Sequence, residues 1–220
     1  MKHILFDLDG TLLDTGRGIV KSIQYALKSV GIDIKDLKSL EKHIGPPLKE
    51  GFEAFYGFDH EKSEMAVSKF RERYKEIGLL ETTPYEGIEE CLKALSQQEV
   101  KLYVATSKPE VIAKEFLEHF RLSSFFIDIC GSTFDHTIST KADVIRYLME
   151  KNNLSIIDDI IMVGDREQDV LGANEVGIPS IGVLYGFGSK EELQAAGAKY
   201  ITKTPEEVIQ VILGDTKGIQ

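Results

Sequence analysis

The stretch Ile4-Leu5-Phe6-Asp7-Leu8-Asp9-Gly10-Thr11 decides the fold class, because it joins a short apolar strand to two carboxylates and a turn. Two carboxylates directly after a buried strand are costly unless they are paired or bound to a metal ion. The chain turns at Gly10, so one side chain and a neighbouring backbone carbonyl can share a metal. An exposed acidic turn is the plainer alternative for this segment taken alone.

Further apolar runs of strand type follow along the chain, at residues 102–105, 125–130, 160–163 and 181–184. Between most of them the apolar residues have helical spacing, as in Ile88-Cys91-Leu92-Leu95. Apolar strands that alternate with amphipathic helices are typical of parallel sheets covered on both faces. We therefore predict an α/β fold, a doubly wound and mostly parallel sheet.

One long interval, residues 16–83, has helical patterns and no convincing strand. Its two apolar stripes are Ile19, Ile23, Ala26, Leu27 and Val30, and then Val67, Phe70, Tyr74 and Ile77. The simplest interpretation is an α-helical cap of residues 16–83, inserted after the first strand. Residues 1–15 and 84–220 then form the core, with hinges at 14–16 and 82–84.

A second acidic cluster, Asp165-Arg166-Glu167-Gln168-Asp169, follows the strand at 160–163. Open parallel sheets bind ligands at the carboxyl ends of their strands. Asp165 lies at the strand tip, and Asp169 lies one helical turn further on. Clusters of oxygen ligands without His or Cys suit a hard cation, and Mg²⁺ is the best candidate in cells. A helix N-cap at Asp165 is the alternative.

Hydroxyl groups end another strand, in Thr106-Ser107-Lys108-Pro109. Hydroxyls and backbone N–H groups at such a junction are good phosphate ligands. The alternative is a plain helix cap by Thr106 or Ser107, since Pro109 can open a helix. Lys141 starts a later helix, where the helix dipole disfavours a cation. Taken alone, this lysine does not indicate a function.

The composition restricts the partners. The chain has 26 basic and 36 acidic residues, a net charge of −10, and no block of Lys or Arg. Proteins that bind nucleic acid or anionic membranes usually need a basic face, so we expect neither partner. A small anionic substrate then needs a local positive charge, such as a metal ion, to bind.

Cys91 and Cys130 are expected to be buried thiols. No signal peptide or membrane-length apolar run is visible, so we expect a cytoplasmic protein, a monomer or a homodimer.

Together these segments resemble the four motifs of the haloacid dehalogenase superfamily of phosphatases, over nearly the whole chain. Each motif is weak singly, but all four in this order, with a helical insertion after the first, are highly specific. The matching residues are Asp7, Asp9 and Thr11 in the first motif, Thr106 in the second, Lys141 in the third, and Gly164, Asp165 and Asp169 in the fourth.

Within the superfamily the chain is similar to the phosphoglycolate phosphatase group with a helical cap, at residues 12–15, 84–88, 172–179 and 182–188. The loop Gly45-Pro46-Pro47 is closest to members described as 5′-nucleotidases. One departure is Ala142, since relatives often have Pro after the lysine of the third motif. Lys108 is therefore kept as a substitute phosphate contact.

The resemblance implies a magnesium-dependent phosphomonoesterase for a small phosphorylated metabolite, either phosphoglycolate or a nucleoside 5′-monophosphate. Asp7 would be the nucleophile that forms an aspartyl-phosphate, and Asp9 the acid and base. Mg²⁺ would be held by Asp7, the Asp9 carbonyl and Asp165. The remaining roles are phosphate binding by Thr106, Ser107 and Lys141, support of the metal site by Asp169 and Thr11, and selectivity in the cap by Gly45, Pro46 and His43.

Three alternatives stay open. The first is a sugar-phosphate mutase, although the loop at Gly45 has no Arg or Lys to hold a second phosphate. The second is a signalling module that stores an aspartyl-phosphate, against which the long insertion and an acid at Asp9 argue. The third concerns the cap alone: the Gly45 loop can be a plain interhelical turn, and His43 can be a packing residue.

Overall fold

The computed structural model describes residues 2–45, 47–135, 137–155 and 157–214. The chain divides into two compact units. One, the core unit, consists of Met1–Leu13 and Pro84–Gln220, and the other, the helical unit, is Asp14–Thr83. Each unit has its own buried residues, and the two are described separately below.

The core unit contains a six-stranded sheet in the order β5-β4-β1-β6-β7-β8, and its neighbouring strands pair in parallel. The strands are β1 (Lys2–Phe6), β4 (Val100–Pro109), β5 (Asp128–Ser132), β6 (Ile160–Gly164), β7 (Ser180–Val183) and β8 (Tyr200–Thr202). The chain proceeds from β1 to one side and returns to build the other, so the strand order reverses at β1. This topology confirms the doubly wound parallel sheet. It also places the carboxyl ends of β4, β1 and β6 side by side.

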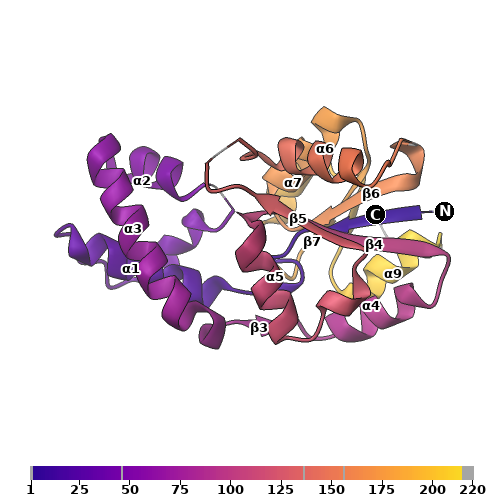
Figure 1. Ribbon diagram of the computed structural model, residues 1–220, viewed down its shortest axis with the longest axis horizontal. Coiled ribbons are helices and arrows are strands. Elements are labelled where there is room, and N and C mark those ends of the chain that lie inside the picture. Colours follow the sequence, from indigo (N-terminus) through magenta and orange to yellow (C-terminus); the bar gives the residue numbers. More distant parts are fainter. Residues whose placement is uncertain (1, 46, 136, 156, 215–220) are drawn as a thin grey trace. The chain divides into compact units, whose positions relative to one another are not determined.

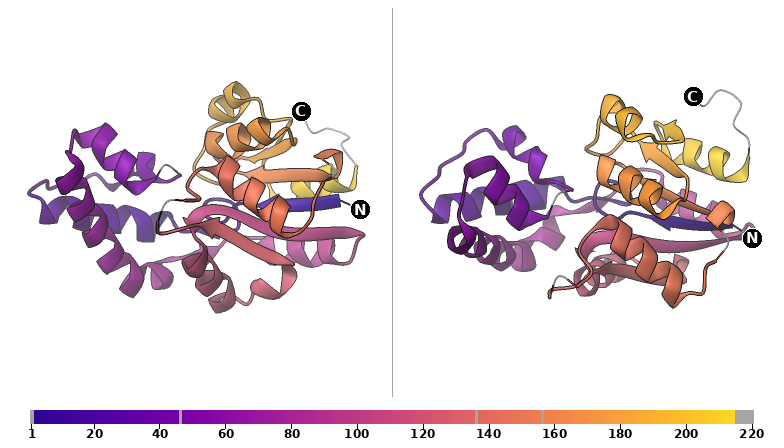
Figure 2. Two further views of the ribbon diagram at one scale, coloured as in Figure 1. Left: turned by 45° about the horizontal axis from the view of Figure 1, so that its top comes forward. Right: turned by 90° about the horizontal axis from the view of Figure 1, so that it is seen from above.

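Helices cover both faces of this sheet (Figures 1 and 2). On one face α6 (Lys141–Lys151) packs on α7 (Glu167–Val176), and on the other α4 (Ile88–Ser96) packs on α9 (Pro205–Leu213). The remaining helices of the unit are α5 (Glu110–His119) and α8 (Lys190–Ala196). Because both faces are covered, the central strand is apolar throughout its buried part: Ile4, Leu5 and Phe6 have no exposed surface.

The structure corrects one strand boundary. The apolar run at 125–130 predicts a strand, but Ser123–Phe125 form a 3-10 turn and β5 begins at Asp128. Ile127, in the middle of that run, is 61% exposed. Hydrophobicity alone does not separate a turn that lies against the sheet from the strand that follows it.

The helical unit is built from α1 (Gly16–Ser29), η1 (Leu37–His43), α2 (Leu48–Tyr56), α3 (His60–Ile77) and η2 (Gly78–Glu81). Helix α1 packs on α3 through the two predicted stripes, whose members are buried except for Val30 and Ile77 at the helix ends. Glu81 adds ion pairs with Lys21 and Arg73, at 2.7 and 2.9 Å, which connect the end of the unit to both helices. Two short strands, β2 (Leu13–Asp14) and β3 (Thr83–Pro84), form a separate sheet at the unit boundaries.

Candidate active site

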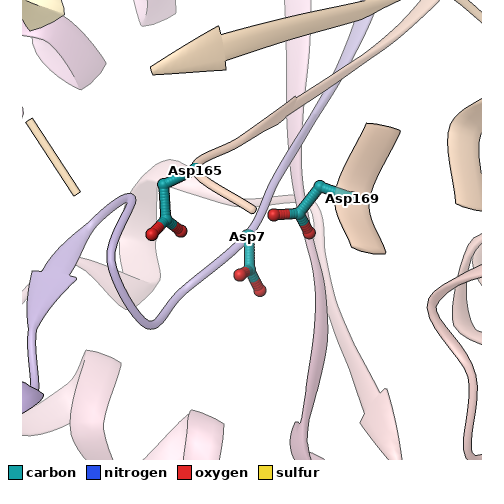
Figure 3. A group of neighbouring side chains, drawn as sticks. All are labelled: Asp7, Asp165 and Asp169. Atoms are coloured by element: carbon teal, nitrogen blue, oxygen red, sulfur yellow. The ribbon is translucent and has the colours of Figure 1, made fainter. Parts of the chain in front are cut away.

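Three carboxylates meet at the carboxyl edge of the core sheet (Figure 3). Asp7 follows β1, Asp165 follows β6, and Asp169 lies in the first turn of α7. One oxygen of each lies within 4.8 Å of the others, and all three residues are buried. The backbone N–H of Asp7 donates to Val163 at 2.8 Å, which fixes the tip of β1 against β6. The structure thus brings Asp7 together with Asp165, which lies 158 positions further along the chain, and with Asp169, four positions after Asp165.

Asp165 is held by the turn after β1 on one side. The Thr11 hydroxyl donates to Asp165 Oδ1 at 3.2 Å. Gly10 has a φ of +87°, and a Cβ there would lie 2.2 Å from Asp165 Oδ2. Glycine is therefore required at this position by its backbone conformation and by the approach of the carboxylate.

On its other side Asp165 is held by the loop that follows β7, at residues 185–188. The backbone N–H of Phe187 donates to Asp165 Oδ2 at 2.8 Å. A Cβ on Gly188 would lie 1.9 Å from the Asp165 carbonyl oxygen, and one on Gly186 would lie 2.3 Å from that of Gly10. Sequence reasoning missed this role of the loop. Gly186 and Gly188, on either side of Phe187, could have indicated it, because glycine is needed where one backbone segment approaches another closely.

Neither Asp165 nor the hydroxyl residues Thr106 and Ser107 form the helix N-cap that the sequence left open as an alternative. The N-cap of α7 is Arg166, and Asp165 accepts instead from Phe187. Asp169 accepts from the Arg166 N–H at 3.1 Å, so Asp169 caps the helix while it faces the other carboxylates. The N-cap of α5 is Pro109, with no side-chain cap.

Lys141, the first residue of α6, lies between two of the carboxylates. Its Nζ is 2.7 Å from Asp7 Oδ1 and 2.7 Å from Asp169 Oδ1, and it donates to the carbonyl of Ala105 at 3.0 Å. The side chain is 3% exposed. A lysine at a helix N-terminus opposes the helix dipole, and two carboxylates at this distance outweigh that cost. Thr140 caps the helix through the Asp143 N–H and sets its start at Lys141.

A second buried lysine pairs with Asp9. Lys108 Nζ is 2.8 Å from Asp9 Oδ1 and 3.0 Å from Oδ2, so one ammonium group contacts both oxygens. The Lys108 side chain is 6% exposed and that of Asp9 is 17% exposed. Sequence reasoning kept Lys108 only as a substitute phosphate contact and did not foresee this ion pair.

The hydroxyl pair lies at the end of β4, beside β1. Thr106 is buried, and its oxygen accepts from the Lys108 N–H at 3.2 Å, a bond that leaves the hydroxyl hydrogen for another acceptor. The Ser107 carbonyl accepts from the Ser132 hydroxyl at 2.8 Å. Both residues therefore lie at the edge where Asp7 lies, on a backbone that is fixed from two sides.

Burial raises the pKa values of two carboxylates in the acidic cluster. Burial, with the charge of Asp169, raises the pKa of Asp7 to about 6, against the opposing effect of Lys141. Burial, followed by the charges of Asp169 and Asp7, raises the pKa of Asp165 well above its ordinary value. Burial alone would lower the pKa of Lys141, but Asp169 and Asp7 more than offset this and raise it. The fold holds these carboxylates at a cost that a further cation would relieve.

The donor set fits a magnesium ion. Asp7, Asp165 and Asp169 offer oxygen atoms only, as Mg²⁺ prefers. With Asp9 they make four carboxylates, and Lys108 and Lys141 supply two compensating charges. When all four carboxylates are ionised, two negative charges remain in a mostly buried site, and one divalent cation would balance them. Cys91 and Cys130 take no part here: both are free and buried, and burial raises the pKa of each thiol to about 12.

The residues predicted in the cap all belong to the helical unit. His43 is 2% exposed, and its ring stacks on Tyr56 at 5.6 Å and lies among Phe52 and Phe55. Burial, and then the charge of Lys42, lowers the pKa of His43 to about 4. The His43 ring is thus packed among aromatic side chains of this unit. Gly45 is exposed with a φ of +108°, and Pro46 lies outside the described residues.

Over the described part of the chain, no helix combines the length and the apolar composition needed to cross a membrane.

Comparison with known proteins gives the family. The sequence profile of the haloacid dehalogenase-like hydrolases matches residues 4–183. A 5′-nucleotidase of Pseudomonas aeruginosa is 47% identical over 193 residues, which are 88% of this chain and 87% of that protein. The tyrosine-protein kinase PtkA of Mycobacterium tuberculosis is 33% identical over 90% of this chain and 67% of its own. A phosphoglycolate phosphatase of Vibrio vulnificus is 26% identical over 97% of this chain and 96% of its own.

A solved structure agrees with these matches. That of a predicted phosphatase from Clostridium acetobutylicum has a TM-score of 0.94 and 49% identity, and covers 97% of this chain and 98% of that one. The family that the four motifs indicate is thereby confirmed. The chain belongs to the haloacid dehalogenase-like hydrolases, and it is a phosphoric monoester hydrolase.

Proposed function

We propose that this protein is a magnesium-dependent phosphatase of a small phosphorylated metabolite and that it works through an aspartyl-phosphate on Asp7. The observation that carries the proposal is the position of Asp7. It ends the central strand beside two further buried carboxylates, with the ammonium group of Lys141 at 2.7 Å. Asp7, Asp165 and the Asp9 carbonyl would hold the metal. When bound, Mg²⁺ supplies the charge neutralisation that lets a carboxylate approach a phosphate dianion.

In the first step an oxygen of Asp7 attacks phosphorus. The bond between that oxygen and phosphorus forms, and the bond from phosphorus to the ester oxygen breaks. The leaving oxygen takes a proton from Asp9. Lys141, with the Thr106 hydroxyl and the backbone at Ser107, would bind the phosphoryl oxygens, and such charge stabilisation is usually the largest contribution to catalysis.

In the second step water attacks phosphorus, and Asp9 accepts a proton from it. Inorganic phosphate leaves and the Asp7 carboxylate is restored. Asp9 is held in an ion pair with Lys108, at 2.8 Å. Asp169 keeps Lys141 in place throughout, at 2.7 Å.

The helical unit would serve as a cap, residues 16–83, that excludes water from the bound substrate. Gly45, with the positive φ of its loop, is the candidate for a contact that selects the leaving group. The relative named 5′-nucleotidase makes nucleoside 5′-monophosphates the first substrates to test, and phosphoglycolate the second. Two buried free thiols suit a reducing compartment, so we place the protein in the cytoplasm, as a monomer or a homodimer.

The test is a screen of the purified protein with Mg²⁺ against nucleoside 5′-monophosphates, phosphoglycolate and an aryl phosphate, with release of inorganic phosphate as the readout. A chelator should abolish turnover, and added Mg²⁺ should restore it. Asp7→Asn should remove activity, and Asp9→Asn should lower kcat by about 10²- to 10⁴-fold. The matched control is Asp33→Asn, at an exposed position of the helical unit. Near-normal turnover by Asp7→Asn would refute the mechanism.

Transfer to an acceptor other than water is the second candidate, because one relative is named a tyrosine-protein kinase. The same screen separates the two. A hydrolase releases one phosphate for each ester consumed, whereas a mutase or kinase leaves the phosphoryl group on a new hydroxyl. A phosphorylated Asp7 that persists for minutes after the donor is removed would instead indicate a signalling module.

A further inference from the structure

Lys108 is a cation of the site to which the four sequence motifs assign no role. Its Nζ contacts both oxygens of Asp9, at 2.8 and 3.0 Å, and its side chain is 6% exposed. Surface ion pairs contribute little, but this pair lies in the wall of a mostly buried acidic site. What it does to Asp9 therefore matters to the reaction.

The backbone is built to bring Lys108 to this position. The pairing of β4 with β5 loses its register between Thr106 and Pro109, so Lys108 lies on a bulge of the strand. Bulges of this kind re-aim side chains next to active sites. The bulge needs Gly131 on the neighbouring strand, because a Cβ there would lie 2.4 Å from the Lys108 carbonyl oxygen. The Ser132 hydroxyl holds the Ser107 carbonyl beside it.

The side chain of Lys108 is fixed as well. Its Nζ lies 4.8 Å from the centre of the Phe116 ring, a residue of α5 that is 3% exposed. A cation over a buried ring is attracted by it and loses the freedom to swing away. The ammonium group is thus held at one point, and Asp9 is held by the ammonium group.

Asp9 needs such a hold because of its neighbours. The charge of Asp9 contributes to the raised pKa of Asp7, so the two carboxylates repel each other. Asp165 and Asp169 lie with Asp7 in the same acidic cluster. Without a cation beside it, the Asp9 carboxylate, 17% exposed, would turn toward water.

We propose that Lys108 is a positioning residue that holds the Asp9 carboxylate in its catalytic orientation against the repulsion of the acidic cluster. This inference rests on the proposed function, since it assumes that Asp9 moves the proton. It differs from a role as a phosphate ligand, in which Lys108 would act on the substrate directly. The two roles predict different kinetics.

The decisive experiment is a double-mutant cycle of Lys108→Met and Asp9→Asn, measured with the best substrate of the screen. Lys108→Met keeps the length of the side chain and removes its charge. If Lys108 acts through Asp9, the single variant loses up to about 100-fold in kcat with KM little changed, the scale of a misplaced catalytic group. In the Asp9→Asn background the same change should then cost nothing further. Lys108→Arg, which keeps the charge, should recover part of the loss.

Two further variants guard against a loss of folding. Phe116→Leu leaves Lys108 and Asp9 intact but removes the ring, and should lower kcat in the same direction by a smaller factor. Lys114→Met, at a half-exposed lysine of the same helix, is the control and should leave kcat and KM unchanged. Circular dichroism and the urea midpoint of each variant show whether it is folded.

A loss that is equal in both backgrounds, or that appears as a raised KM with weaker inhibition by inorganic phosphate, would overturn the proposal in favour of a phosphate ligand. An unchanged kcat in folded Lys108→Met would overturn it outright. The proposed function fails separately, if the wild-type protein with Mg²⁺ hydrolyses no ester of the screen or if Asp7→Asn stays active.

Discussion

The substitution Lys141→Met removes the cation that lies between Asp7 and Asp169 while it keeps an unbranched side chain of similar length. In the native structure the Lys141 Nζ is 2.7 Å from an oxygen of each carboxylate. Its side chain is 3% exposed, and those of Asp7 and Asp169 are 11% and 2% exposed. Water therefore cannot replace the lost charge without entering the site.

The magnitude follows from this burial. Removing one partner of a buried ion pair typically costs about 3–5 kcal/mol, because the other partner is left charged and uncompensated. We expect a loss of this size in the free energy of unfolding at pH 8 without metal. The loss should shrink at low pH. The pKa of Asp7 is raised to about 6 in the fold from 3.8, so the fold binds this proton more tightly than the unfolded chain does. The cost of an ionised Asp7 is fully present above pH 6 and is relieved as the pH falls toward 4.

The assay is urea denaturation of both proteins at pH 8 and pH 5, in a chelator and again in excess Mg²⁺. The difference between wild type and variant should be smaller at pH 5 than at pH 8, because the loss of the Lys141 charge raises the pKa of Asp7 further in the variant. The variant therefore gains more stability than the wild type when Asp7 is protonated. Mg²⁺ should stabilise the variant more than the wild type, because the variant site carries one more uncompensated negative charge. Lys151→Met is the matched control: its partner Asp128 lies at 3.0 Å but the lysine is 37% exposed, so the loss should stay below about 1 kcal/mol.

A loss below about 1 kcal/mol for Lys141→Met at pH 8 would refute the reasoning, because it would mean that the carboxylates are solvated or already protonated. An equal loss at both pH values would refute the part assigned to Asp7. Either result would also weaken the case for a metal at this site.

Two more predictions concern Gly188 and His43. In Gly188→Ala the new methyl group would lie 1.9 Å from the Asp165 carbonyl oxygen, so the loop must shift. Calorimetry should then show Mg²⁺ binding weakened by about 10- to 100-fold, and an unchanged affinity would show that the loop does not position Asp165. The neutral His43 ring contributes stability that is complete above pH 6.5 and is lost as the pH falls toward its folded pKa of about 4. Between pH 7 and pH 5 the free energy of unfolding of the wild type should therefore fall by about 2 kcal/mol more than that of His43→Gln, as measured by urea denaturation. A parallel pH dependence in the two proteins would contradict the burial of an uncharged ring.

The fold could be predicted because the strands of a covered parallel sheet are apolar on both faces and appear as continuous runs. Ile4-Leu5-Phe6 is such a run, and it forms the central strand. The prediction was wrong at residues 125–127, which precede β5 and include the end of a 3-10 turn, and it did not include β8. Strand β8 has only three residues, Tyr200–Thr202, and a pattern of that length does not separate a strand from a loop.

The acidic site could be anticipated in part for a topological reason. Carboxyl ends of neighbouring parallel strands meet at one edge, so acidic residues after two such strands are brought together wherever the strands are adjacent. Asp7 and Asp165 follow adjacent strands, and the sequence supplies that much. The contact of Phe187 with Asp165 and the pairing of Lys108 with Asp9 depend on a loop path and a bulge. No local pattern encodes which distant carboxylate either one reaches.

The arrangement of the two lysines answers the question of how an acidic protein can attract an anionic substrate. The net charge of −10 repels a phosphate ester at long range, and the four carboxylates repel it at the site itself. Lys141 and Lys108 divide these carboxylates, one between Asp7 and Asp169 and the other on Asp9, and so neither lysine alone makes the site positive. With all four carboxylates ionised, a divalent cation would balance the two negative charges that the lysines leave, and the ammonium group of Lys141 would then be available to the phosphate. Substrate affinity should therefore depend on Mg²⁺ before any chemistry takes place, and inorganic phosphate should bind the wild-type protein only when Mg²⁺ is present.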